Sequence, residues 1–266
     1  MSNAASWPAV AVDHLPETDE TITALPWPAR HRLARAWIGR ASGELGASAV
    51  FSHLVGGLLQ RGCDPELIWL ASQAVNDELR HAEACRHLAS AFAGERMPWP
   101  KCPAVTPPIY GRASPSFTTT LQVVHNCCLS ETIGAAYLQG CLAAAVGPLV
   151  RAVLRTLLRD EVNHARIGWG YLGDPTFDPE ERRELGRALP TLLQHVRERW
   201  RTRPPTYTDP VEGHGCIPRA RVCEVVDEAI TTLVLPGLEH VGVDTAEARR
   251  MMKTLGVVHK TPPSRQ

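Results

Sequence analysis

Hydrophobic residues recur every three to four positions along most of this chain. A period near 3.6 residues is typical of amphipathic α-helices that bury one face. Four long helices are expected, at about residues 29–60, 65–93, 117–146 and 148–171. Shorter helices are expected after them, at about residues 179–201, 221–233 and 245–255. The pattern therefore predicts an all-α protein.

Short breaks join the long helices in pairs. Arg61–Pro65 separates the first two helices, and Gly147-Pro148 separates the last two. Because glycine readily ends a helix and proline readily begins one, each pair is expected to form an antiparallel hairpin. The Pro-rich stretch 94–116 joins the hairpins. Its 23 residues reach roughly 75 Å when extended, against roughly 45 Å for a 30-residue helix, so it is long enough to cross back along a four-helix bundle.

Three regions are expected on this basis. Residues 1–28 are Pro-rich and weakly periodic, and are interpreted as an N-terminal arm. Residues 29–172 form the four-helix bundle. Residues 173–266 form a C-terminal helical extension that packs on the bundle.

Composition narrows the choice of partners and compartment. The 266 residues are 44% hydrophobic, enough for a sizeable core, and the formal net charge is zero, so neither nucleic acid nor an anionic membrane surface is an expected partner. The most apolar stretch, residues 134–150, is interrupted and too short to span a bilayer. The N-terminus shows no secretion signal, and none of the eight Cys forms a Cys-x-x-Cys pair, so a reducing cytoplasm is expected.

Two copies of Asp-Glu-x-x-His carry the candidate chemistry. They lie at Asp77–His81 and Asp160–His164, within the second and fourth long helices. Residues three apart share one face of a helix. Each copy therefore directs one carboxylate and one imidazole to a common point.

A lone glutamate precedes each copy on the neighbouring helix. Glu44 and Glu131 lie about 16 to 18 residues before the breaks, and the two motifs lie about 14 to 18 residues after them. At 1.5 Å per residue, each lone glutamate is level with its partner motif in an antiparallel hairpin. Six side chains are therefore expected to converge in the middle of the bundle, namely Glu44, Glu78, His81, Glu131, Glu161 and His164.

Buried carboxylates in this number are very costly unless cations balance them. Two divalent metal ions would neutralise four glutamates, and such oxygen-rich ligation suits Fe or Mn better than Zn. The aspartates preceding the motif glutamates are expected to accept the outer N–H of the histidines across the helix pair. Asp77 would support His164, and Asp160 would support His81.

This pattern resembles the ferritin-like di-iron carboxylate oxygenases and oxidases. In that family an acidic residue stands about 30 residues before Asp-Glu-x-x-His, twice over, and the likeness here covers about residues 30–170. It implies a ferritin-like bundle, two Fe ions (with Mn or a mixed Fe/Mn pair left open), and catalysis at the six ligands. It also implies O2, a small organic substrate and a separate electron-donor reductase as partners.

Three positions depart from individual subfamilies. Cys85 stands where the radical tyrosine of ribonucleotide reductase small subunits would lie. Leu157 replaces the extra histidine of arylamine N-oxygenases, and Ala135 replaces a threonine of the hydroxylases. The resemblance therefore does not distinguish hydroxylation, desaturation and N-oxygenation.

Small and apolar residues near the lone glutamates could leave a pocket beside the metals, although close helix packing explains each of them equally well. The candidates are Ala47, Ser48, Phe51, Cys85, Ala135 and Leu138. An apolar pocket would favour a hydrophobic or aromatic substrate.

The leading hypothesis is thus a non-haem di-iron monooxygenase or oxidase. The alternative is a metal-handling or peroxide-scavenging protein of the rubrerythrin or Mn-catalase type. A third option is that the metals serve only as structural staples. The oligomeric state is left open, with a homodimer as one candidate.

Overall fold

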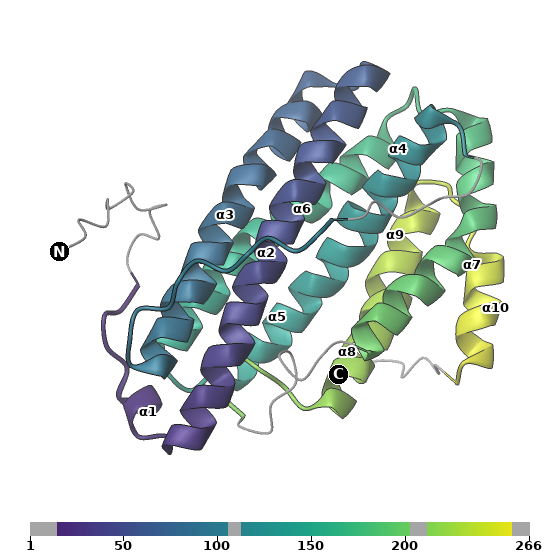
Figure 1. The fold of residues 1–266 in the computed structure, drawn as a ribbon. Helices are drawn as coiled ribbons and strands as arrows, with labels where there is room; N and C mark the ends of the chain where they lie inside the picture. The colour runs from purple at the N-terminus through teal and green to yellow at the C-terminus, as the bar shows by residue number, and fades with distance from the viewer. Residues whose placement is uncertain (1–14, 106–112, 203–211, 257–266) are drawn as a thin grey trace, which may run out of the picture.

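The computed structural model describes residues 15–105, 113–202 and 212–256 (Figure 1). Within these ranges all regular structure is helical and no strand occurs, so the predicted all-α class is confirmed. In the same ranges, no helix combines the length and the apolar character needed to cross a bilayer.

Most helices begin and end within a few residues of the predicted positions. In chain order they are α1 (Glu20–Thr23), α2 (Trp27–Arg61), α3 (Pro65–Ala93), α4 (Pro115–Val123), α5 (Thr132–Ala144), α6 (Pro148–Gly173), α7 (Pro179–Arg201), α8 (Arg219–Ala229), α9 (Leu235–His240) and α10 (Ala246–Thr254). Two π-helical segments, η1 (Val124–Glu131) and η3 (Ile230–Val234), join α4 to α5 and α8 to α9 without a break.

Four long helical segments lie side by side as two hairpins (Figure 1). In the first hairpin, α2 ends at Arg61 and is followed by Gly62, whose φ of 65° favours glycine. Helix α3 begins directly after Asp64, whose side chain accepts the Glu66 N–H at 2.7 Å. In the second, α4–η1–α5 is followed by Gly147 and then Pro148, the first residue of α6. Contacts of α3 with α6, and of α2 with α4, bring the hairpins together.

The connection between the hairpins lies along α2 over the part that is described. Ser42 Oγ donates to the Lys101 carbonyl at 2.9 Å, and Pro103 lies against Gly46, where a Cβ would come within 3.0 Å of the proline ring. The described part of the predicted crossover thus lies along α2, and its residues Pro103, Ala104 and Val105 border a cavity. Residues 106–112 of the predicted crossover lie outside the described residues.

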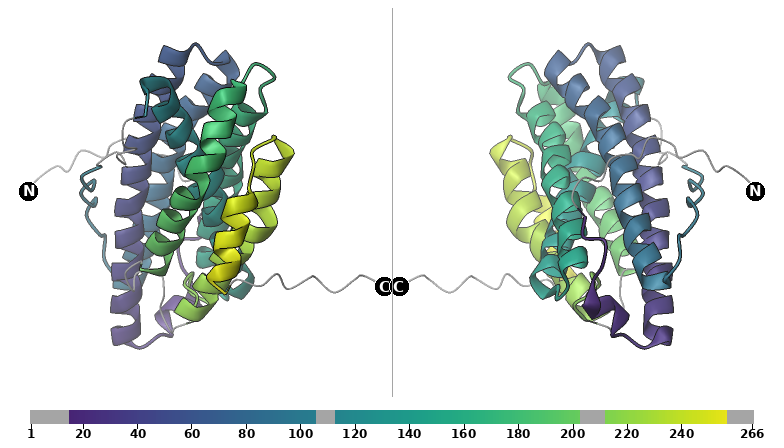
Figure 2. Two further views of the ribbon diagram at one scale, coloured as in Figure 1. Left: turned by 90° about the vertical axis from the view of Figure 1, so that its right-hand side faces the viewer. Right: turned by 90° about the vertical axis from the view of Figure 1, so that its left-hand side faces the viewer.

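The C-terminal helices cover one side of the four long segments (Figure 2). Helix α7 packs against α4, η1 and α8, and α8 packs against α5. Arg197 on α7 donates to both carboxylate oxygens of Asp227 on α8, at 2.6 and 3.0 Å. The C-terminal helices α7 and α8 therefore pack on the four long segments.

Two boundaries differ from the sequence prediction. The helix expected at 221–233 continues as α8–η3–α9 to His240. Part of the predicted arm is packed rather than free. Ile22 is 1% exposed, and Asp19 Oδ2 accepts the Leu149 N–H at 3.0 Å, which caps α6. Residues 1–14 of that arm lie outside the described residues.

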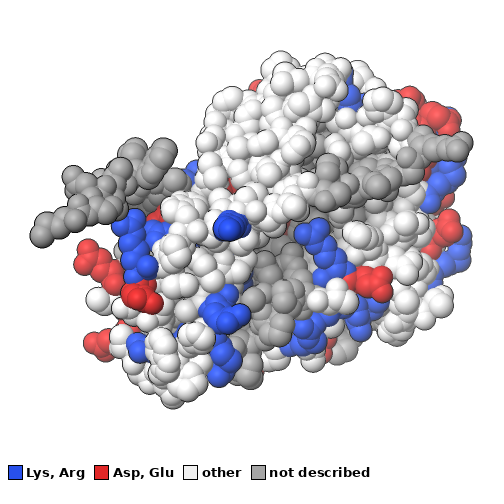
Figure 3. Space-filling model, viewed as in Figure 1, with Lys and Arg blue, Asp and Glu red and all other residues white. Residues whose placement is uncertain are grey.

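Acidic and basic side chains both occur on the face viewed in Figure 3, in small separate groups with uncharged surface between them. This distribution matches the formal net charge of zero.

Close approach of α6 and η1 depends on Gly168. A Cβ at this position would lie 2.9 Å from the backbone nitrogen of Cys128, whereas a Cβ at Gly56 on α2 would meet nothing within 4 Å. We expect Gly168→Ala to lower the free energy of unfolding by about 1–3 kcal/mol through overpacking. The matched variant Gly56→Ala is expected to raise it by about 0.5–1 kcal/mol, since alanine is the better helix former. Urea denaturation measures both, and equal stabilities would contradict the close contact.

Candidate metal centre

The six predicted ligands come together inside the four long segments. Glu44 lies on α2, Glu78 and His81 on α3, Glu131 at the end of η1, and Glu161 and His164 on α6. Their ligand atoms form two groups in which all atoms lie within 4.8 Å of one another. One group is Glu44, Glu78, His81 and Glu161, and the other is Glu78, Glu131, Glu161 and His164.

The two groups share Glu78 and Glu161. His164 Nδ1 lies 3.2 Å from Glu78 Oε1 and 3.2 Å from Glu161 Oε2. His81 Nδ1 lies 3.4 Å from Glu78 Oε2 and 3.6 Å from Glu161 Oε1. Each of these two carboxylates thus presents one oxygen to each histidine, which is the arrangement a bridging carboxylate needs.

The outer nitrogens of both histidines meet the aspartates expected from the sequence. His81 Nε2 lies 3.3 Å from Asp160 Oδ2, and His164 Nε2 lies 3.4 Å from Asp77 Oδ2. Both predicted contacts cross from one helix to its neighbour. A carboxylate that accepts the Nε2–H leaves Nδ1 as the lone-pair atom facing the centre.

Arg80 links the two aspartates, a role that the sequence analysis missed. Its guanidinium lies 2.6 Å from Asp77 Oδ1 and 3.0 Å from Asp160 Oδ2. Arg159 adds a second contact to Asp160, at 2.8 Å. Burial raises the pKa of Asp160, but hydrogen bonds from His81 and Arg159 outweigh it and hold that pKa well below its usual range. Asp160 therefore remains an anion that can orient His81.

Two buried atoms at the centre lack a hydrogen-bond partner. They are Glu78 Oε2 and His81 Nδ1, on side chains that are 1% and 0% exposed. Buried polar atoms almost always have a hydrogen-bond partner. Two buried acceptor atoms that lack one and face the same point are what a bound cation would pair with. Four carboxylates and two neutral imidazoles also match the charge of two divalent ions. The residues therefore fit a two-metal site.

Protons occupy several of these groups when no metal is bound. Burial, followed by repulsion from Glu78 and Glu161, raises the pKa of Glu44 well above its usual value. Burial and the charge of Glu161 do the same to Glu131. Burial lowers the pKa of His81, but the neighbouring carboxylates of Asp160 and Glu78 raise it overall to about 10. A metal ion must displace these protons to bind.

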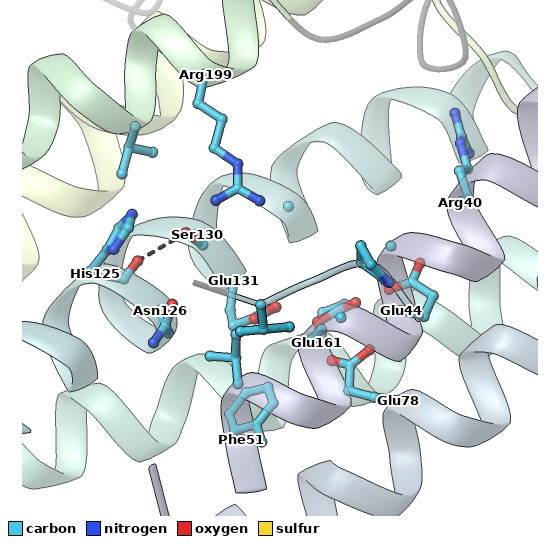
Figure 4. A pocket seen from close by; sticks show the side chains of 18 of the residues that line it. Arg40, Glu44, Phe51, Glu78, His125, Asn126, Ser130, Glu131, Glu161 and Arg199 are labelled. Atoms are coloured by element: carbon cyan, nitrogen blue, oxygen red, sulfur yellow. Dashed lines mark hydrogen bonds between the residues drawn. The ribbon is translucent and has the colours of Figure 1, made fainter. Parts of the chain in front are cut away.

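A cavity of ≈ 690 Å³ opens beside the centre, between α2, η1, α5 and α7. All four ligand glutamates border it (Figure 4). Among the predicted pocket residues, Ala47, Phe51 and Leu138 line this cavity. The Phe51 ring lies 5.1 Å from the His164 ring.

The structure differs from the prediction for three other pocket residues. Ser48 turns toward α3, where its Oγ donates to the Val75 carbonyl at 3.0 Å. Cys85 is fully buried and is absent from the cavity lining. Ala135 borders a separate hollow between α5, α6 and α9. It lies four residues after Glu131, and four residues of α-helix rotate its side chain about 40° away from the direction of Glu131.

The sequence analysis missed the polar part of the lining. It includes Gln122, His125, Asn126, Ser130 and Arg199, together with Arg40, His53 and Thr202. The structure places His125 in the cavity wall, 3% exposed.

The π-helical segment η1 explains why the polar lining residues on it were missed. Asn126 and Glu131 are five residues apart, which would separate them by about 140° around an α-helix. In a π-helix the hydrogen bonds run from i to i+5, so such residues approach the same side. Both line the cavity, and both lie in η1. A 3.6-residue hydrophobic period carries no signal for this extra winding.

Comparisons of the chain with protein-family models, with curated proteins and with solved structures find no match. The centre is therefore interpreted from its own geometry.

Metal content of variants tests the shared ligands. We expect about two metal ions per chain in the unaltered protein, one for each ligand group. Glu44→Ala removes a ligand from one group only and is expected to leave about one ion, whereas Glu78→Ala weakens both groups and leaves fewer. Metal analysis after gel filtration measures this, and equal losses from both variants would contradict the shared position of Glu78.

Metal affinity is expected to rise with pH. The pKa values of Glu44, Glu131 and His81 are all raised, so protons compete with the metal at and below neutral pH. The apparent affinity is expected to increase about tenfold per pH unit for each proton displaced. Competition with a chelating dye at pH 6 and pH 7.5 measures this increase. An affinity independent of pH would mean that the ligands are already deprotonated.

Proposed function

We propose that this protein is a ferritin-like di-iron oxidoreductase that uses O2 to oxidise a small organic molecule. One observation carries the proposal: two overlapping groups of buried ligands share Glu78 and Glu161 and open on a cavity. Paired helical hairpins that supply one glutamate and one Glu-x-x-His unit each support the ferritin-like assignment.

Each ligand has a distinct place in this proposal. Glu78 and Glu161 belong to both ligand groups and would help to hold both ions, Glu44 and His81 would hold one, and Glu131 and His164 would hold the other. When bound, two iron ions would supply the electron transfer to O2 that protein side chains cannot perform. Manganese or a mixed pair would use the same ligands.

The chain's own residues would hold the substrate and exclude water. A volume of ≈ 690 Å³ falls within the range of small-molecule sites. Phe51, Leu138 and Leu157 form apolar walls next to the carboxylates of Glu44 and Glu131. These walls would keep bulk water from the centre and hold a substrate beside the two carboxylates that are not shared.

The cavity also bears on the alternative of peroxide scavenging or metal handling. Hydrogen peroxide and metal ions are far smaller than a space of this volume. A large lined cavity in contact with the ligands therefore favours an organic substrate over these alternatives. Hydroxylation, desaturation and N-oxygenation all remain compatible with the same geometry.

Anaerobic loading with Fe(II), iron analysis and rapid mixing with O2 test the proposal. We expect about two irons per chain, fast O2 consumption and a transient visible absorbance band. Glu78→Gln is expected to lose the reaction, because it removes a charge from both ligand groups. Glu66→Gln, at an exposed position in the first turn of the same helix, is the matched control and is expected to react like the unaltered protein.

Two outcomes would count against the proposal. Iron uptake without any reaction with O2 would favour a structural or peroxide-related role for the metals. Failure to take up metal at any pH would mean that the six ligands do not form a metal centre.

A further inference from the structure

The cavity beside the candidate centre has two chemically different ends. Near the centre its walls are Glu44, Glu131 and apolar side chains that include Phe51 and Leu157. At the other end, α4, η1 and α7 contribute polar groups (Figure 4). These polar groups are Gln122, His125, Asn126, Ser130 and Arg199. An occupant with one apolar part and one polar part would match both ends.

Arg199 is the cation of the polar end. Its side chain extends from α7 toward Ser130 and Glu131, on the cavity side of the helix (Figure 4). Four other arginines of α7 pair with carboxylates of the protein: Arg183 and Arg187 with Glu180, and Arg197 and Arg201 with Asp227. Within the described residues, no carboxylate forms an ion pair with Arg199. Its charge is therefore available to a ligand that enters the cavity.

His125 adds a hydrogen-bonding group next to this cation without adding charge. Its ring is buried in the cavity wall and lies 5.7 Å from the ring of His195. Burial, together with the positive charges of His195 and Arg199, lowers the pKa of His125 to about 4, so the ring is neutral at pH 7. The polar end thus presents a single exposed guanidinium among neutral donors and acceptors.

We infer that the cavity binds a small organic acid, with its carboxylate on Arg199 and its apolar body against Phe51 and Leu138. A planar guanidinium matches a carboxylate through two parallel hydrogen bonds, and one positive charge matches one negative charge. A substrate with an ammonium group at this end would be repelled. This inference rests on the proposed function and names the substrate class of the same site.

Binding of two fluorinated probes tests the inference, with ¹⁹F NMR as the readout on the metal-loaded protein. 4-Fluorobenzoate carries the carboxylate, and 4-fluorobenzamide is its neutral counterpart of nearly the same shape. We expect the benzoate to bind about tenfold more tightly than the benzamide, as a charged hydrogen-bond pair allows. Equal affinities, or no binding of the benzoate, would overturn the inference.

Variants locate the bound carboxylate. Arg199→Met is expected to weaken benzoate binding about tenfold and to leave benzamide binding unchanged, whereas Arg199→Lys restores part of the benzoate affinity. The matched control is Arg187→Met, on the exposed face of the same helix, where no effect is expected. Unchanged benzoate binding in Arg199→Met would overturn the inference, because the carboxylate would then be bound elsewhere, for example at the metals.

A third variant shows whether the probes enter the cavity. Gly134 lines it, and a Cβ at this position would meet nothing within 4 Å, so a larger side chain can extend into the space. Gly134→Leu is expected to weaken binding of both probes. Undiminished binding of both probes would overturn the inference, since they would then occupy the outside of the protein.

Metal analysis of the same samples separates the two proposals. Two metals per chain with no dependence of binding on Arg199 would overturn the organic-acid inference and leave the di-iron proposal standing. Binding that depends on Arg199 in protein that takes up no metal would overturn the di-iron proposal and support binding of an organic acid in the cavity.

Discussion

The cost of burying four carboxylates at one point governs the rest of this structure. Glu78 and Glu161 are 1% and 6% exposed, and Glu44 and Glu131 stand beside them. Without cations, burial and the repulsion between carboxylates raise the pKa values of Glu44 and Glu131, and the carboxylates around His81 raise the pKa of that histidine. Two divalent ions remove the same repulsion while leaving all four groups charged. Metal ions bound here would have to displace the protons on these groups, so metal binding would be coupled to proton release.

The surrounding helices hold this charge arrangement in register. His81 and His164 each reach across to an aspartate of the neighbouring helix, and Arg80 joins the two aspartates. These contacts tie α3 to α6 at the level of the ligands. A slip of one helix by a single turn would separate a histidine from both its aspartate and the centre, so the outer contacts define the geometry of the inner ones.

The cavity depends on a different set of features. The π-helical turn of η1 brings Asn126 to the same side as Glu131, and Gly134 leaves space where a side chain would otherwise fill the gap. Helix α7 closes the far side and supplies Arg199, while Arg197 anchors α7 to Asp227 of α8. The C-terminal extension therefore does more than cover the bundle, because it contributes the charged end of the proposed substrate site.

The local sequence determined the helices, their breaks and the level at which each ligand lies, because helical periodicity, Gly and Pro act over a few residues. It also determined the pairing of Asp77 with His164 and of Asp160 with His81, because a fixed rise per residue makes such positions calculable once the hairpins are assumed. Tertiary structure alone decided the rest. The extra winding of η1, the packing of Ile22 and the approach of Arg199 from α7 all arise from contacts between distant segments. Such contacts leave no periodic trace in the chain, since each depends on which surfaces meet after the helices have packed.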